Sequence, residues 1–243
     1  DWESYLRLRG RVSEKRGWIM MSGSFESCVP AGTLILTNRG ILPISEVTPG
    51  DTVFGLEGQT KVSEVWNLGE KQLYEILLDK GYSIQTTNNH KFLALNQKGC
   101  LDWVRADALT TKHLVAIRYG TELWGTQSYD PGLAYLAGLY IAEGSCDVQG
   151  NSHRISIATT QDETSAFMQE LGFTYSALSM QWRDTRNDLA QSFKDMGIDL
   201  KWHAKQKQIP PGILKSDRNT VIAFLRGLFD GDAWEVKREN YLS

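Results

Sequence analysis

Three residues in the first half of the chain have side chains that could carry out nucleophilic chemistry. Cys28 supplies a thiol, Thr87 a hydroxyl and His90 an imidazole. A small fraction of cysteine is thiolate at neutral pH and is strongly nucleophilic, and imidazole can transfer a proton at the same pH. The same residue types also fit a small core cysteine and a histidine in a surface turn. The residues alone therefore leave both interpretations open.

Two carboxylates in the second half each follow a series of small residues spaced by four. The two series are Ala134, Gly138 and Ala142 before Glu143, and Ala223, Gly227 and Gly231 before Asp232. Residues four apart line one face of a helix, and small faces let two helices approach closely. If these helices pack face to face, the two carboxylates meet at their C-terminal ends. The spacing favours Asp232 over the nearby Asp230.

A pair of carboxylates at helix C-termini is unfavourable, because the two charges repel each other and oppose the helix dipoles. A shared Mg²⁺ would offset both costs, since this ion takes carboxylate and water oxygens. The alternative is two ordinary amphipathic helices with acidic surface residues.

The elements that must position these residues differ between the two halves. Residues 28–120 contain short runs rich in Val, Ile, Leu and Thr, separated by six turn signals that each include a glycine, which predicts a compact all-β region. After 121–130, a predicted linker with glycine and Asp130-Pro131, the pattern changes. It predicts helices over 132–142, 162–171, 188–196 and 221–229, and a strand over 154–159.

Composition limits the classes of protein that fit. The 243 residues are 41% hydrophobic and carry a net charge of −3, as in a soluble globular protein. No apolar run is long enough for a transmembrane helix, so we expect no membrane partner. Residues 121–243 have a net charge of −4, which is poor for nucleic-acid binding. Their one basic cluster, Lys201, Lys205 and Lys207, has the composition of ordinary solvated surface. Three cysteines without metal-site spacing predict free thiols and a cytoplasmic location.

The first half resembles an intein, a Hint domain, over residues 28–120. Cys28 with the following Pro-x-Gly-Thr-Leu-Ile is similar to the first intein block, and Gly81 to Phe92 is similar to the second. The segments at 42–51 and 102–109 fit as well. The resemblance implies self-splicing without a cofactor, with Ser27–Cys28 as the cleavage site and Cys28 as the nucleophile. His90 would protonate the departing nitrogen, and Thr87, with Asn88 or Asn89, would hold the oxyanion.

The second half resembles the LAGLIDADG homing endonucleases, whose two motifs match the helices ending at Glu143 and Asp232. The Gln208-Ile209-Pro210-Pro211 segment is also similar, whereas Ala233 replaces a usual glycine. The resemblance implies cleavage of double-stranded DNA, with Glu143 and Asp232 as ligands of Mg²⁺.

The expected architecture is α+β and multidomain: an all-β, horseshoe-like Hint module followed by a mixed α/β LAGLIDADG module that is truncated at its C-terminus. We expect an N-extein leader at 1–27, the Hint region at 28–120, a linker at 121–130 and an incomplete endonuclease domain at 131–243. Part of the leader resembles the ATPase coupling segment of viral large terminases.

The expected partners are the flanking exteins, a missing C-terminal intein segment and double-stranded DNA. Two alternatives stay open: a split-intein-like N-terminal binding half, and a DNA-binding LAGLIDADG module that does not cleave.

Overall fold

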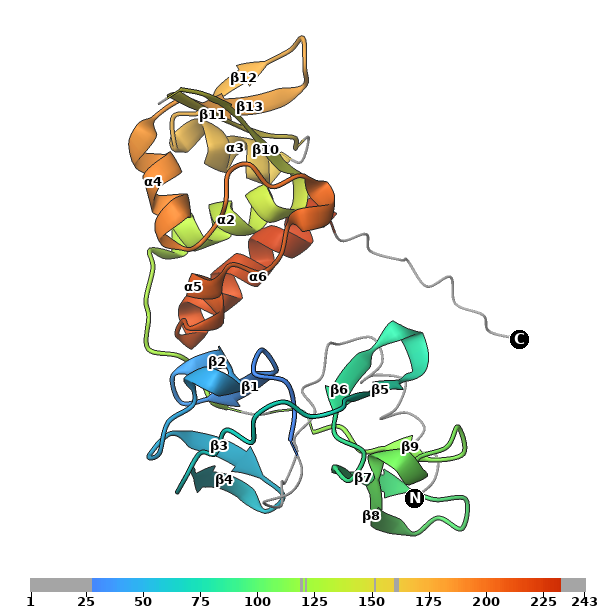
Figure 1. The fold of residues 1–243 in the computed structure, drawn as a ribbon. Coiled ribbons are helices and arrows are strands. Elements are labelled where there is room, and N and C mark those ends of the chain that lie inside the picture. The colour runs from blue at the N-terminus through green and yellow to red at the C-terminus, as the bar shows by residue number, and fades with distance from the viewer. Residues whose placement is uncertain (1–27, 119, 121, 151, 160–161, 233–243) are drawn as a thin grey trace, which may run out of the picture. The chain divides into compact units, whose positions relative to one another are not determined.

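The computed structural model describes residues 28–118, 120, 122–150, 152–159 and 162–232 (Figure 1). Within these residues the chain divides into two compact units, one up to Trp124 and one from Gly125 onward. The predicted leader, Ser27 and the residues after Asp232 lie outside the described part. Gly125 and Gln127 are hydrogen-bonded to Ser216 and Lys215 of the second unit, although both fall within the predicted linker. The predicted domain boundaries themselves stay predictions.

The first unit consists of short antiparallel strands joined by turns and 3₁₀ helices. Its first sheet has the order β2-β1-β3-β4. The four strands are β1 (Leu34–Thr37), β2 (Gly40–Pro43), β3 (Thr52–Gly55) and β4 (Gly58–Lys61). The 3₁₀ helix η1 (Ile44–Glu46) follows β2. Arg118 donates to the carbonyl of Gly55 at 2.6 Å and ties the end of this unit to the β3–β4 turn.

Two smaller sheets complete this unit. The strands β5 (Tyr74–Leu77) and β6 (Ser83–Thr86) pair around η2 (Asp79–Gly81). The third sheet has the order β8-β7-β9 and contains β7 (Lys91–Leu95), β8 (Leu101–Arg105) and β9 (Leu114–Val115), with η3 (Ala106–Ala108) after β8. The region from 28 to 118 is therefore built from strands, as the sequence predicted.

Of the six turns predicted in this unit, five are confirmed as turns or as η2, whereas the segment 67–69 forms no regular turn. The glycines of all six segments have positive φ, a conformation that costs glycine little because it has no Cβ; they are Gly40, Gly50, Gly58, Gly69, Gly81 and Gly99. The loop between β2 and β3 is tied by a buried carboxylate. Asp51 accepts hydrogen bonds from the Arg39 side chain at 2.6 and 2.8 Å and from the Thr48 backbone at 2.8 Å. These donors lower the pKa of Asp51 to about 2.

The second unit is an α/β layer structure. Its antiparallel sheet has the order β10-β11-β13-β12, with β10 (Gly144–Gln149), β11 (Ser152–Ile157), β12 (Thr174–Ser176) and β13 (Gln181–Asp184). Its helices are α2 (Pro131–Glu143), α3 (Asp162–Glu170), α4 (Asn187–Asp195), α5 (Pro211–Leu214) and α6 (Arg218–Asp232), with η4 (Ala204–Gln206) before α5. The four predicted helices are present.

Helix α2 lies at the centre of this unit, with α6 beside it and the sheet beyond it (Figure 1). Asp130 caps α2 by accepting from the Leu133 backbone at 2.9 Å, and Pro131 occupies the first turn. The middle of the helix is apolar on all sides and is buried in one hydrophobic core. That core includes Tyr140, Ile155, Phe193 and Phe224, each at most 1% exposed. Because α2 is packed all round, its C-terminal end at Glu143 is held in one position.

None of the helices among the described residues is both long enough and apolar enough to cross a membrane. The three cysteines carry free thiols; Cys100 is exposed, and Cys28 and Cys146 are half-buried.

Candidate functional site

The main chain of Cys28 is held by two threonines at the end of β6. The Cys28 amide donates to the Thr87 hydroxyl at 3.0 Å, and the Thr87 amide donates to the Cys28 carbonyl at 3.0 Å. The Thr86 hydroxyl donates to the same carbonyl at 3.0 Å. The nitrogen of the bond between residues 27 and 28 therefore has a defined hydrogen-bond partner, and that partner is the predicted residue Thr87.

The turn that carries Thr87 and His90 is held in place from the other side by η3. The His90 amide donates to the Thr87 carbonyl at 3.1 Å and closes the turn. The amides of Ala106 and Asp107 donate to the carbonyls of His90 and Asn88 at 2.7 and 3.0 Å. The segment at 102–109 therefore supports the turn between β6 and β7 that contacts Cys28.

His90 is 3% exposed, so it is not a surface turn histidine. Its ring packs edge-on against Phe92, with 5.3 Å between the ring centroids. Neither ring nitrogen has a hydrogen-bond partner among the described residues. Burial lowers the pKa of His90, because the imidazolium loses hydration that nothing replaces. A buried imidazole with two available nitrogens is suited to exchange a proton with a group brought next to it.

The other predicted residues of this centre are placed differently. Asn88 is exposed and Asn89 is half-buried, both within the turn. Ser27 lies outside the described residues, so the oxyanion role of Thr87, Asn88 and Asn89 stays a prediction. Thr86 was missed by the sequence analysis, although it is fully buried and bonded to Cys28. Alternation along β6, in which Ile84 and Thr86 are more buried than their neighbours, is the signal that identifies it.

In the second unit, α2 and α6 pack face to face through the predicted small residues. A Cβ atom at Gly138 would overlap the Phe224 carbonyl, and one at Gly227 would overlap the Tyr135 carbonyl. At the C-terminal end, a Cβ at Gly231 would overlap that of Ala142. The two helices are therefore in close contact at Gly138, Gly227 and Gly231 of the predicted stripe.

The carboxylates at the ends of these helices share a neighbour, Lys207, which follows η4. Its ammonium group donates to the carbonyls of Tyr140 and Gly144 at 2.9 and 2.6 Å. Burial lowers the pKa of Lys207, while attraction to both Glu143 and Asp232 opposes that shift. Glu143 and Asp232 are therefore both within electrostatic range of one ammonium group, whose hydrogen bonds go to main-chain carbonyls.

Lys207 corrects the sequence interpretation of the basic cluster. Lys201 and Lys205 are exposed, as expected of solvated surface, but Lys207 is half-buried beside the carboxylates. Asp230 is engaged elsewhere, because its carboxylate accepts from the Tyr135 hydroxyl at 2.9 Å. This contact supports Asp232 as the partner of Glu143.

The donor set fits an oxygen-preferring cation. Glu143 and Asp232 are both exposed, so their carboxylates are open to solvent. Nowhere in the described ranges do three His, Cys, Asp or Glu side chains gather around one point. Two carboxylates are enough for Mg²⁺, which keeps several water ligands and accepts phosphate oxygens.

Comparison with known proteins identifies the family. The sequence matches the intein splicing domain over residues 34–234, a range that starts after Cys28 and includes Thr87, His90, Glu143 and Asp232. A DNA polymerase from Thermococcus kodakarensis is 26% identical over 238 residues, which cover 84% of this chain and 14% of that protein. Among solved structures, the gp41-1 intein is 22% identical with a TM-score of 0.28, covering 42% of this chain and 91% of its own. Since the family match spans most of the chain, the chain belongs to the intein splicing domains, which carry out protein self-splicing.

Proposed function

We propose that Cys28 begins splicing by attacking the carbonyl carbon of Ser27. The thiolate sulfur forms a bond to that carbon, the bond from the carbon to the Cys28 nitrogen breaks, and a thioester results. The proton that the Cys28 thiol loses would pass to neutral His90, and from the resulting imidazolium to the departing nitrogen, so atoms and charge balance. The observation that carries this proposal is the 3.0 Å hydrogen bond between the Cys28 amide and the Thr87 hydroxyl.

The structure supports separate roles for the neighbouring residues. Thr86 and the Thr87 amide hold the Cys28 carbonyl, so the main chain on that side of the reacting bond cannot rotate freely. The Thr87 hydroxyl touches the leaving nitrogen directly. His90 is the proton donor in this proposal, because it is a buried imidazole on the same turn with both ring nitrogens available. Asn88 or Asn89 would stabilise the oxyanion at Ser27.

Thiolysis followed by intact-mass measurement tests the first step. A small thiol intercepts the thioester and releases residues 1–27, so the chain incubated with thiol at neutral pH should lose the mass of that segment. Cys28→Ala should lose none. The matched control is Cys100→Ala, since Cys100 is an exposed thiol with no bond to this centre and should leave the release unchanged. Equal release from the parent and Cys28→Ala would exclude Cys28 as the nucleophile.

A binding half of a split intein is the alternative within the same family. It predicts no release from the chain alone, and a ligated product only after a C-terminal intein segment is added. Release without that segment, blocked by Cys28→Ala, contradicts this alternative.

We also propose that the second unit is a DNA endonuclease of the LAGLIDADG type. The observation that favours this function is the convergence of Glu143, Asp232 and Lys207 at the ends of α2 and α6. Glu143 and Asp232 would hold Mg²⁺, which, when bound, neutralises phosphate charge and lowers the pKa of water. Lys207 contributes a positive charge next to the position of a scissile phosphate, fixed by the Tyr140 and Gly144 carbonyls.

One face of the β10–β13 sheet supplies a surface for the DNA. Arg154 lies opposite Asp147, and Arg183 lies opposite both Ser156 and Thr174. Opposite residues of antiparallel strands share a face, and so do residues two apart, so both arginines lie on one face. Arg154 is exposed there and Arg183 is half-buried. Ile155 and Ile157 alternate with these residues and belong to the hydrophobic core. Arginine side chains suit phosphate contacts.

Metal-dependent cutting of duplex DNA tests this second function. The chain should cut members of a randomised duplex library with Mg²⁺ but not with chelator, and Glu143→Gln should abolish cutting while DNA retention on a filter persists. Glu170→Gln, at an exposed position at the end of α3, is the matched acidic control. Retention of DNA without cutting by the parent chain would instead support the non-cleaving LAGLIDADG module.

A further inference from the structure

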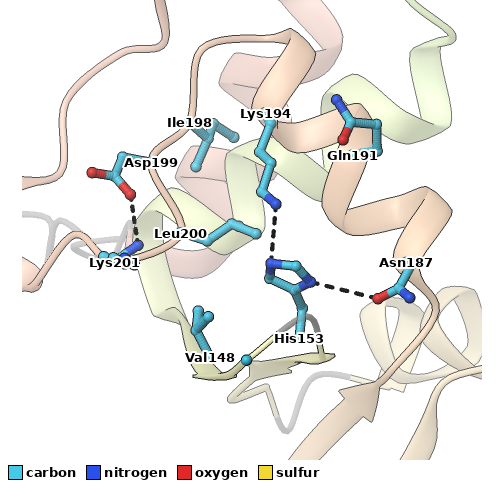
Figure 2. Close-up of a pocket in the computed structure, with 10 residues that line it drawn as sticks. Val148, His153, Asn187, Gln191, Lys194, Ile198, Asp199, Leu200 and Lys201 are labelled. Atoms are coloured by element: carbon cyan, nitrogen blue, oxygen red, sulfur yellow. Dashed lines mark hydrogen bonds between the residues drawn. The ribbon is translucent and has the colours of Figure 1, made fainter.

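A cleft of about 620 Å³ lies in the second unit between the β10–β11 hairpin and α4. Figure 2 shows its side chains, which come from the hairpin, from one face of α4 and from the loop that follows α4. Ile198 and Leu200, 2% and 3% exposed, form apolar wall, while the helix side carries polar groups. None of these residues belongs to the two sites described above.

A chain of hydrogen bonds fixes the polar wall (Figure 2). Lys194 Nζ lies 3.0 Å from His153 Nε2, and His153 Nδ1 lies 3.5 Å from Asn187 Oδ1. An ammonium group can only donate, so the His153 tautomer that satisfies both contacts accepts at Nε2 and donates from Nδ1 to Asn187. Because the side-chain oxygen of Asn187 accepts from His153, its NH₂ group is the part that can donate to a ligand. The imidazole nitrogen facing Lys194 is unavailable to a metal cation.

The charges around the cleft favour a negative ligand. Lys194 and Lys201 both line it, against one carboxylate, Asp199. Asp199 Oδ1 already accepts from the Lys201 backbone at 2.9 Å. Asn187 is the first residue of α4, so the positive end of that helix dipole also lies at the cleft.

We propose that this cleft binds a phosphate-type anion. Its groups are the Lys194 ammonium, the Asn187 amide and a second lining lysine, Lys201. All three can donate hydrogen bonds, and a tetrahedral oxyanion can accept several at once. The same chemistry is offered by free inorganic phosphate and by a phosphodiester of a nucleic-acid backbone. The proposal concerns the cleft only and does not depend on Cys28 chemistry or on DNA cleavage.

Titration of the chain with inorganic phosphate tests the proposal. We expect saturable heat in calorimetry with a Kd on the order of 1 mM, and a shift of the His153 imidazole signals in nitrogen-15 NMR at the same midpoint. Lys194→Gln should weaken binding about tenfold or more, because it removes a charge-assisted hydrogen bond. Asn187→Asp keeps the shape of the side chain and puts a carboxylate in the cleft, so it should abolish binding. Lys205→Gln removes an exposed lysine that does not line the cleft and should change nothing.

A second titration identifies the source of the phosphate. If the ligand is a backbone phosphodiester, a short DNA duplex shifts the same His153 signals and inorganic phosphate competes with it. If the ligand is free phosphate, the duplex leaves those signals unchanged. The proposal is overturned if phosphate does not move the His153 signals, or if Asn187→Asp, with unchanged circular dichroism and melting temperature, binds phosphate as the parent does.

Discussion

Thr87 is the central residue of the proposed splicing site, because its hydroxyl and its amide both form hydrogen bonds with the main chain of Cys28. Thr86 adds a third bond from a fully buried position. With a longer contact from the Thr87 hydroxyl to the Cys28 carbonyl at 3.4 Å, four contacts fix the main chain of Cys28. In the proposed mechanism this order would lower the entropic part of the barrier. His90 completes the turn, and its buried ring is set apart from bulk water.

Replacing Thr87 with Val should slow thiol-induced release of residues 1–27 by about fivefold, because one hydrogen bond to the leaving nitrogen is worth about 1 kcal/mol. Thr87→Ser keeps the hydroxyl and should retain most of the rate. The measurement is the initial rate of mass loss. Thr110→Val, an exposed threonine bonded only within its own turn, is the control. A Thr87→Val rate equal to that of Thr110→Val would remove Thr87 from the mechanism.

His90 should make the first unit less stable in mild acid. Its pKa is lowered in the folded state, so the unfolded state binds the proton more tightly. Stability contributed by neutral His90 is therefore present above the ordinary histidine pKa of about 6.5 and is lost as the pH falls below it. Urea unfolding at pH values from about 7.5 to 5 should show this loss, and His90→Gln should flatten the curve in that window. His113→Gln is the matched control.

At the scale of elements, the contact between α2 and α6 decides where Glu143 and Asp232 lie. The glycines at this contact leave no room for a methyl group, because main-chain carbonyls of the partner helix occupy the Cβ positions of Gly138 and Gly227, and the Ala142 Cβ that of Gly231. The middle of α2 is buried in the core, so its register relative to α6 cannot slide without moving buried side chains.

Gly138→Ala should destabilise the second unit by about 3 kcal/mol or more, because the added methyl group must push the two helices apart. It should also weaken any Mg²⁺-dependent DNA cutting, since the carboxylates separate. Gly32→Ala is the matched control, because no atom lies within 4 Å of its Cβ position and its φ is not positive, and it should change stability by less than about 0.5 kcal/mol. Urea unfolding gives both values. Equal midpoints for the two variants would contradict the close packing.

The loop between β2 and β3 depends on the buried Asp51 carboxylate. Asp51→Asn should destabilise the first unit by about 2 kcal/mol at neutral pH, in line with a pKa held near 2 in the folded state. Because this pKa is depressed, the contribution is present above about pH 4 and is lost as the pH falls toward 2. The expected result is that parent and variant converge in stability in strong acid. Asp102→Asn, at an exposed position, should leave neutral-pH stability unchanged.

At the scale of the whole molecule, the two proposed chemistries lie in separate compact units. Each has its own hydrophobic core or sheets and its own set of side chains, so the chemistries should be separable by mutation. Glu143→Gln should leave thiolysis at Cys28 unchanged and remove DNA cutting, whereas Cys28→Ala should do the reverse. Mass spectrometry and a cleavage gel on the same two proteins check this. Loss of both activities in either variant would show that the units depend on each other.

Local patterns in the sequence predicted much of this fold. Glycine turns punctuate the β region because only glycine adopts positive φ without strain, and that preference is readable residue by residue. The four-residue spacing of small side chains predicted the packing of α2 on α6 for a similar local reason. Strand β10 was not predicted, because Gly144, Ser145 and Asp147 have low strand propensity and only pairing with β11 makes the segment a strand.

The sequence by itself determined the residue types available for chemistry: a cysteine, a Thr-x-x-His turn and two matched carboxylates. Tertiary structure alone decided that Thr86 also holds Cys28 and that His90 is buried. It also decided that Lys207, unlike Lys201 and Lys205, is half-buried and within electrostatic range of Glu143 and Asp232. The physical reason is the separation along the chain over which each effect acts. Turn and helix preferences act over a few neighbouring residues, whereas burial and electrostatic partners depend on which distant segments the fold brings together.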